Sequence, residues 1–204
     1  MDLAEAQQQM GDLAGSLPAL KTAEQLNSRI ELSVLLISRY NTAGDSANAA
    51  RLARRVMIEA STSRNGLYQA NRGLLMAGEV SEAAEAARLF HQNPIADSDP
   101  TTAQMLDIRQ ACAEGRDADA NKIFASFLTL ADITSHWNAL IALGRNQEAE
   151  DLLRVYDSPD TVLQLFSFYR SPQFDPRPFP FLMEVLEREG AAPRPLIPIP
   201  YACG

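Results

Sequence analysis

The side chains of this chain best suited to metal binding or thiol chemistry are two histidines and two cysteines. His91 and His136 lie far apart and match no metal-ligand spacing such as HExxH. Cys112 and Cys203 match neither a CxxC pattern nor a zinc spacing, and the sequence contains no GxSxG and no glycine-rich phosphate loop. We therefore predict no catalytic site, no metal and no cofactor, and we expect both cysteines to be free thiols in a reducing cytoplasm.

The elements that position the side chains form a repeat. Four glycines recur with steps of 34, 37 and 29 residues, and an alanine follows each glycine after five residues. The glycines are Gly44, Gly78, Gly115 and Gly144, and the alanines are Ala49, Ala83, Ala120 and Ala149. A glycine can take a positive φ and end one helix, and a small alanine lets the next helix cross closely. The pattern predicts antiparallel helical hairpins stacked as a solenoid.

This repeat resembles the tetratricopeptide repeat over about residues 25–157. The step near 34 residues, the alanine after each glycine and Tyr40, where that family usually has its first-helix tyrosine, carry the resemblance. The family's tryptophan is missing, and its small residue between helices is replaced by Ile37, Asn71, Ile108 and Trp137. The closing proline is matched only approximately, by Pro94 and Pro159. The resemblance implies an all-α, right-handed superhelical array of antiparallel helical hairpins with about ten helices.

Apolar periodicity and breaks predict the helix positions, with Gly11–Gly15 ending the first helix and Pro18 near the next start. We expect helices over 2–13, 20–42, 46–61, 64–76, 80–91, 101–113, 117–130, 133–143, 146–157, 160–169 and 181–190. Trp137 is expected to fill the core of the shortened hairpin, and the alternative is that it anchors a bound partner. We divide the chain into a tetratricopeptide-like helical repeat domain, 1–190, and an extended, proline-rich C-terminal tail, 191–204, that packs on the last repeats.

The resemblance also implies a binding surface. Solenoids of this kind bind peptides or partner helices along a concave groove lined by their first helices. The family's groove positions, ten and six residues before each glycine, are here Val34, Ser38, Tyr68, Arg72, Met105, Arg109, Thr134 and Asn138. Arginines beside an aromatic ring suit an acidic peptide or a C-terminal carboxylate. The alternative is that these arginines solvate a helix face or pair with nearby glutamates. The lysines of the family's carboxylate-binding members are missing, so that specific function is not implied.

The C-terminal region carries a second resemblance. FDPRPFPFLMEVLEREG, followed by IPYAC, resembles the ends of helical-repeat regions in bacterial signalling proteins, which join such an array to a cyclase or a winged helix. It implies that the chain is the repeat part of a larger bacterial signalling or regulatory protein. Four apolar residues of the tail are expected to cap the last hairpin, or alternatively to dock in the groove of a second copy. They are Leu196, Ile197, Ile199 and Tyr201.

Charge and apolar run lengths limit the partners. The formal net charge of −8 disfavours direct binding to nucleic acid. No N-terminal stretch has the pattern of a secretory signal, and no apolar run approaches the roughly 20 residues that span a bilayer. We expect a cytoplasmic, non-catalytic module that binds a protein or peptide. The alternatives are a homo-oligomerisation module, such as a homodimer, and an all-α enzyme whose active site the sequence does not reveal.

Overall fold

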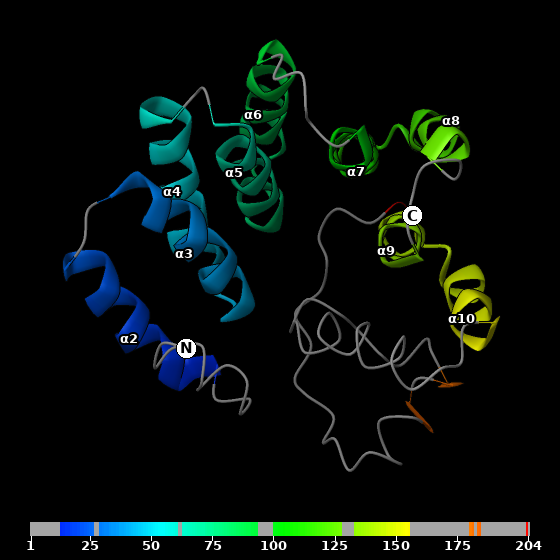
Figure 1. Cartoon of the computed structure of the whole chain (residues 1–204), viewed down its shortest axis with the longest axis horizontal. Helices are drawn as coiled ribbons and strands as arrows, with labels where there is room; N and C mark the ends of the chain where they lie inside the picture. Colours follow the sequence, from blue (N-terminus) through cyan, green and yellow to red (C-terminus); the bar gives the residue numbers. More distant parts are fainter. Residues whose placement is uncertain are drawn as a thin grey trace.

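The computed structural model describes residues 13–26, 29–60, 63–93, 100–127, 133–155, 180–181, 183–184 and 203. In these ranges all regular structure is α-helical and there is no strand, which confirms the predicted all-α class. The helices are α2 (Leu13–Leu26), α3 (Ile30–Thr42), α4 (Ser46–Glu59), α5 (Arg64–Met76), α6 (Val80–Gln92), α7 (Pro100–Ala113), α8 (Asp117–Phe127), α9 (Ile133–Ala142) and α10 (Asn146–Val155) (Figure 1). None of the described helices is long and apolar enough to cross a membrane.

The helices pack mainly against their neighbours in the chain, and α3, α5, α7 and α9 also contact one another in this order (Figure 1). We call these four helices the first-helix row. Gly73 allows α5 to approach α3 and α4 closely. A Cβ at this position would lie 2.8 Å from Ile37 Cγ2 of α3 and 3.5 Å from the Ala49 carbonyl oxygen of α4. Because glycine has no Cβ, α5 can lie directly against the α3–α4 hairpin.

The four repeat glycines end the first helices with one backbone conformation. Their φ angles are 77°, 78°, 69° and 68° at Gly44, Gly78, Gly115 and Gly144, all in the left-handed region. In each turn the N–H of the residue after the glycine donates to a carbonyl five residues earlier. The bonds are Asp45–Tyr40, Glu79–Leu74, Arg116–Ala111 and Arg145–Leu140, at 2.9, 2.9, 2.8 and 2.9 Å. This is the Schellman helix end, and it confirms the predicted helix-ending role of the glycines.

The same residue that completes each turn also starts the second helix. Its carbonyl accepts a hydrogen bond from the N–H of the repeat alanine four residues later, at 2.9–3.1 Å in all four copies. At the first copy the Asp45 side chain adds an N-cap by accepting from the Asn48 N–H at 3.1 Å. All four repeat alanines are fully buried, which agrees with the predicted close helix crossing.

The core follows the hairpins as three clusters. One joins α2 to α6 around Ile37 and Tyr40, and another joins α7 to α10. A smaller cluster between them contains Leu67 and Phe90 and links α5 and α6 to α7. Trp137 lies in the α7–α10 cluster and is 2% exposed, which confirms the prediction that it fills the core.

The N-terminal helices differ from expectation. The predicted continuous helix over 20–42 is wrong, because α2 and α3 are separate helices and Arg29 between them has an extended backbone with φ −64° and ψ 139°. The expected helix end near Gly15 is also wrong, since α2 runs through both Gly15 and Pro18. Burial of Leu20 anchors α2 against the core despite the hydrogen bond that a helical proline removes.

The remaining helix boundaries from 46 to 155 agree with the predicted ones to within three residues. Three predictions fall wholly or largely outside the described residues: the helices at 2–13 and 160–169 and the tail at 191–204. Within the predicted helix over 181–190, residues 181, 183 and 184 are helical. Of the tail, the structure describes Cys203.

Replacing Gly78 by alanine should isolate the cost of the left-handed turn. No atom lies within 4 Å of the position its Cβ would take, so strain at φ 78° is the main penalty. We expect Gly78→Ala to lower the free energy of unfolding by about 1–2 kcal/mol in urea titrations. Gly78→Asn is the control and should lose less, because asparagine tolerates this conformation better. Equal losses would contradict the assignment.

A second prediction concerns Tyr40, which is fully buried and donates to Glu24 Oε2 at 3.2 Å. Burial, and then the charge of Glu24, raises its pKa from 10.0 to about 12. The folded state therefore retains this proton more strongly than the unfolded chain does. The stabilisation is complete below pH 10 and is lost as the pH rises from about 10 to about 12.

Urea unfolding between pH 8 and 11 should show this loss above pH 10 in the wild-type protein. Tyr40→Phe should lack this component of the pH dependence, because phenylalanine does not titrate. Identical slopes for the two proteins would show that Tyr40 is not the responsible group.

Candidate functional site

The two histidines occupy separate places in the array. His91 Nε2 lies 2.7 Å from Asp107 Oδ1 and connects α6 to α7. His136 of α9 packs against the Phe124 ring, and burial followed by the Arg145 charge lowers its pKa. Among the described residues, no group of three His, Cys, Asp or Glu side chains is placed to hold a metal ion. Each histidine thus contacts a neighbouring helix rather than the other histidine.

A surface cavity of about 350 Å³ lies between α9 and α10. It is lined by His136, Leu140, Glu148, Asp151, Leu152 and Val155. The two carboxylates are already engaged, since Arg145 donates to Glu148 at 2.6 Å and Gln147 donates to Asp151 at 3.0 Å. These residues include no serine, threonine or cysteine that could serve as a nucleophile. Leu140, Leu152 and Val155 give the cavity an apolar lining that suits an apolar side chain.

The predicted groove residues lie on the first-helix row, and the structure brings two of them together. Arg109 Nη1 of α7 donates to the Tyr68 hydroxyl of α5 at 2.7 Å, and its Cζ lies 5.5 Å from the centre of the Tyr68 ring. Because a phenol is neutral, this bond orients the guanidinium without cancelling its charge. Arg72 is half-buried and follows Tyr68 by one turn, on the same face of α5. The junction of α5 and α7 therefore presents an aromatic ring with arginines around it.

The other predicted groove residues contribute differently. Val34 and Met105 support the core: Val34 packs partly buried against the α2–α6 cluster, and Met105 is 6% exposed within the α7–α10 cluster. Met105 therefore offers a partner almost no surface. Ser38 and Asn138 are half-buried on α3 and α9. The side chain of Thr134 lies outside the described residues.

A buried hydrogen-bond network lies beside this junction, and sequence reasoning missed it. Asn71 Nδ2 of α5 donates to the Ala83 carbonyl of α6 and to Gln110 Oε1 of α7, both at 2.9 Å. Gln110 Nε2 in turn donates to the Val80 carbonyl at 3.3 Å and to Glu114 Oε1 at 2.7 Å. Asn71 is 1% exposed and Gln110 is 5% exposed, so the bonds form in a low-dielectric environment. The network sets the register of α7, and hence of Arg109, against α5.

The signal for this network was present in the sequence. Asn71 stands where the resembled family has a small residue, and its amide was read only as a departure from the family. A polar amide at a core position of a helix requires a partner. Its partner Gln110 is 39 residues away in sequence, so the fold was needed to identify it.

Two arginines on the second helix α4 form ion pairs with glutamates of other elements. Arg54 of α4 bridges to α6 through Glu82 at 2.6 Å and Glu79 at 3.3 Å, and Arg51 pairs with Glu24 of α2 at 2.6 Å. These pairs lie near the surface and each contributes little to stability. They do place carboxylates against the arginines of this side. On the row, Arg109 donates a hydrogen bond to the Tyr68 hydroxyl.

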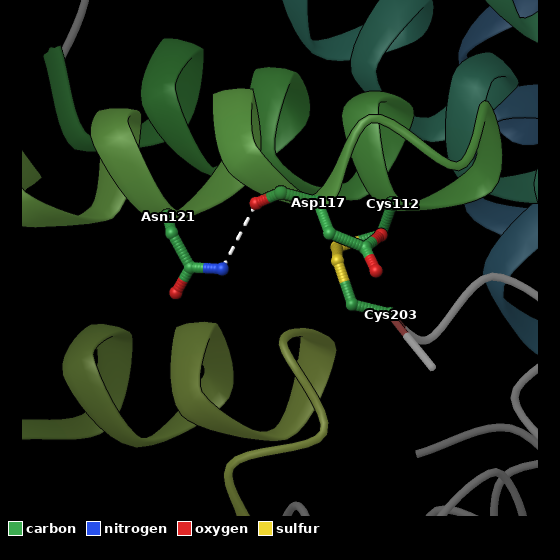
Figure 2. The surroundings of a disulfide bond; sticks show 4 residues. All are labelled: Cys112, Asp117, Asn121 and Cys203. Carbon is green, nitrogen blue, oxygen red and sulfur yellow. Dashed lines mark hydrogen bonds between the residues drawn. A yellow bond between two sulfur atoms is a disulfide. The ribbon is translucent and has the colours of Figure 1, made fainter.

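The two cysteines form a disulfide, so the expectation of free thiols is wrong (Figure 2). Cys112 near the end of α7 bonds to Cys203, with a sequence separation of 91 and 4.6 Å between their Cα atoms. The Cys203 N–H also donates to the Ala142 carbonyl at the end of α9, at 3.0 Å. Only the fold brings the ends of α7 and α9 to residue 203, which is why the spacing in sequence gave no indication of the bond.

Comparisons with models of protein families, with curated proteins and with solved structures found no match. The resemblances to tetratricopeptide repeats and to bacterial signalling proteins thus remain expectations.

Removing the buried hydrogen bond between Asn71 and Gln110 should lower the stability of the fold. We expect Asn71→Ala to lower the free energy of unfolding by about 2 kcal/mol, because it leaves buried polar atoms of Gln110 without this partner. The double variant Asn71→Ala/Gln110→Ala should lose less than the sum of the two single losses. Urea titrations of the four proteins measure this coupling. Strictly additive losses would show that the two amides do not act together.

Proposed function

We propose that this chain is a non-catalytic module that binds a protein or peptide along its first-helix row. In this proposal the helices form a right-handed superhelical array of antiparallel hairpins of the tetratricopeptide type, with the row on its concave side. The module belongs to a bacterial signalling or regulatory protein and works in the cytoplasm. The bacterial and signalling parts rest on the C-terminal resemblance alone.

The observation that carries the proposal is the order of the helix contacts. The first helices α3, α5, α7 and α9 contact one another in sequence, whereas the surface ion pairs of Arg54 join α4 to α6. The helices of the row pack closely, whereas the second helices are joined through long side chains. This difference favours an array that curves toward the row. A concave row is the surface on which solenoids bind extended ligands.

The chemistry of the row favours an acidic ligand. Arg109 is oriented by Tyr68, and Arg72 lies one turn from that ring on the same helix face. A guanidinium held in place beforehand loses less conformational freedom when it binds a carboxylate, and its planar donors match both carboxylate oxygens. A peptide with acidic side chains or a free C-terminal carboxylate fits this arrangement.

The test is the binding of a fluorescein-labelled peptide of four glutamates with a free C-terminal carboxylate, followed by fluorescence anisotropy. We expect Arg72→Glu/Arg109→Glu to bind at least about ten-fold more weakly than wild type, which is about 1.4 kcal/mol. The matched control is Arg55→Glu/Arg88→Glu, which makes the same change in charge at the surface pairs with Glu59 and Glu85. Circular dichroism checks that both variants fold.

The control variant should bind the peptide nearly as well as wild type. Equal weakening in both variants would mean that net charge, not the row, governs binding. If the peptide binds neither wild type nor the variants, whether the Cys112–Cys203 bond is formed or reduced, the acidic-ligand proposal is wrong.

One observation favours self-association as a second candidate. Leu26 of α2 and Ile58 of α4 are large apolar side chains that are 82% and 81% exposed. Contact between two copies would bury them. Light scattering over a range of protein concentrations separates the candidates, because a mass that rises toward the dimer supports self-association.

A further inference from the structure

Cys203 contacts Cys112, Ala142 and Gly144 at the ends of α7 and α9, and we call the place of these contacts the notch. Figure 2 shows the bond between Cys112 and Cys203. Cys203 is bonded to Cys112 through its side chain, and its N–H donates to the Ala142 carbonyl at 3.0 Å. Its carbonyl oxygen lies 2.7 Å from the point where a Cβ on Gly144 would be. One residue outside the helices therefore makes a side-chain, an N–H and a carbonyl contact with the same notch.

Gly144 differs from Gly78 and Gly115 in this respect. Those two glycines have nothing within 4 Å of the corresponding Cβ position. Gly144 has both the left-handed φ of 68° and a main chain packed against it. The notch is thus shaped for a close main-chain approach, which a side chain at 144 would prevent.

The notch also adjoins the proposed binding surface. Both helices that form it, α7 and α9, belong to the first-helix row. Cys112 follows Arg109 by three residues, so the two side chains lie on one side of α7. Cys203 therefore lies at the ends of two helices of the row.

We propose that this notch is a docking site for an extended peptide, occupied in cis by Cys203 and vacated when the disulfide is reduced. The inference rests on the proposed function, since the incoming ligand is the acidic peptide of the row. Reduction frees the Ala142 carbonyl and the space beside Gly144 for one residue of that peptide. In a cytoplasm, a disulfide that opens and closes is the usual kind.

The reduction balances with a dithiol as the reductant. A thiolate of the dithiol attacks Cys203 Sγ, because Cys203 is partly exposed whereas Cys112 is buried. The Sγ–Sγ bond breaks, Cys112 leaves as a thiolate and takes up a proton, and a mixed disulfide forms on Cys203. The second thiol of the reductant then displaces Cys203, which also takes up a proton. Two electrons and two protons pass from the dithiol to the protein.

The first test needs no peptide. Gly144→Ala should place a Cβ against the Cys203 carbonyl and so disfavour the disulfide-bonded form. Gly78→Ala is the control, because it imposes similar turn strain but has open space around the new Cβ. The full-length proteins are equilibrated in mixtures of reduced and oxidised dithiothreitol, and free thiols are counted by alkylation and mass spectrometry. We expect the disulfide equilibrium constant to fall by at least about ten-fold in Gly144→Ala and to stay near the wild-type value in Gly78→Ala.

Three results would overturn the inference. Two free thiols in protein prepared without reductant would remove the disulfide. Equal equilibrium constants in both glycine variants would remove the fit at Gly144. Loss of helical circular dichroism when wild type is reduced, or in the folding control Cys203→Ser, would make the bond a structural crosslink rather than a release point.

The second test repeats the anisotropy measurement with the tetraglutamate peptide. Reduced wild type and Cys203→Ser should bind at least about ten-fold more tightly than oxidised wild type. Equal binding by all three would overturn the notch as a peptide site and leave the proposed function standing. If none binds, the acidic-peptide function and the docking inference both fail, and the thiol equilibrium then reports only how Cys203 is held.

Discussion

The structure depends on one backbone constraint, the left-handed glycine that ends each first helix. At these four glycines the chain reverses within a few residues and starts the next helix. The N–H after each glycine closes the preceding helix, and the carbonyl of the same residue opens the following one. A single residue therefore sets the geometry of both arms, and this explains why the hairpins stay alike although the steps between them vary from 29 to 37 residues.

Sequence reasoning succeeded at the four repeat turns, where the signal is local. A glycine followed after five residues by an alanine is a short-range signal, and it located the turns, the buried alanines and most helix ends. It failed between α2 and α3, because the apolar spacing of one helix continues into the next and the break has no proline or glycine. It also failed for Cys112, whose partner lies 91 residues away and is brought close only by the packing of α7 and α9.

The candidate site shows the same difference between short-range signals and contacts of residues far apart in sequence. Counting from the glycines selected Tyr68 and Arg109, which the structure joins by a hydrogen bond. The count assumes that equivalent positions have equivalent exposure, and Met105 departs from this because α7 contributes to two core clusters. The amides of Asn71 and Gln110 could not be paired from sequence, yet they fix how α7 lies against α5. Recognition residues were thus easier to predict than the buried groups that position them.

The separation of the two cysteines has a consequence for synthesis. Cys112 leaves the ribosome 91 residues before Cys203, a delay of about 5–18 s at 5–20 residues per second. The α7–α8 hairpin has all of its residues during that interval and can bury Cys112 while its partner is still being made. Protection of this thiol by early packing would keep it from pairing with another chain. The order in which the hairpins are synthesised therefore favours the intramolecular bond.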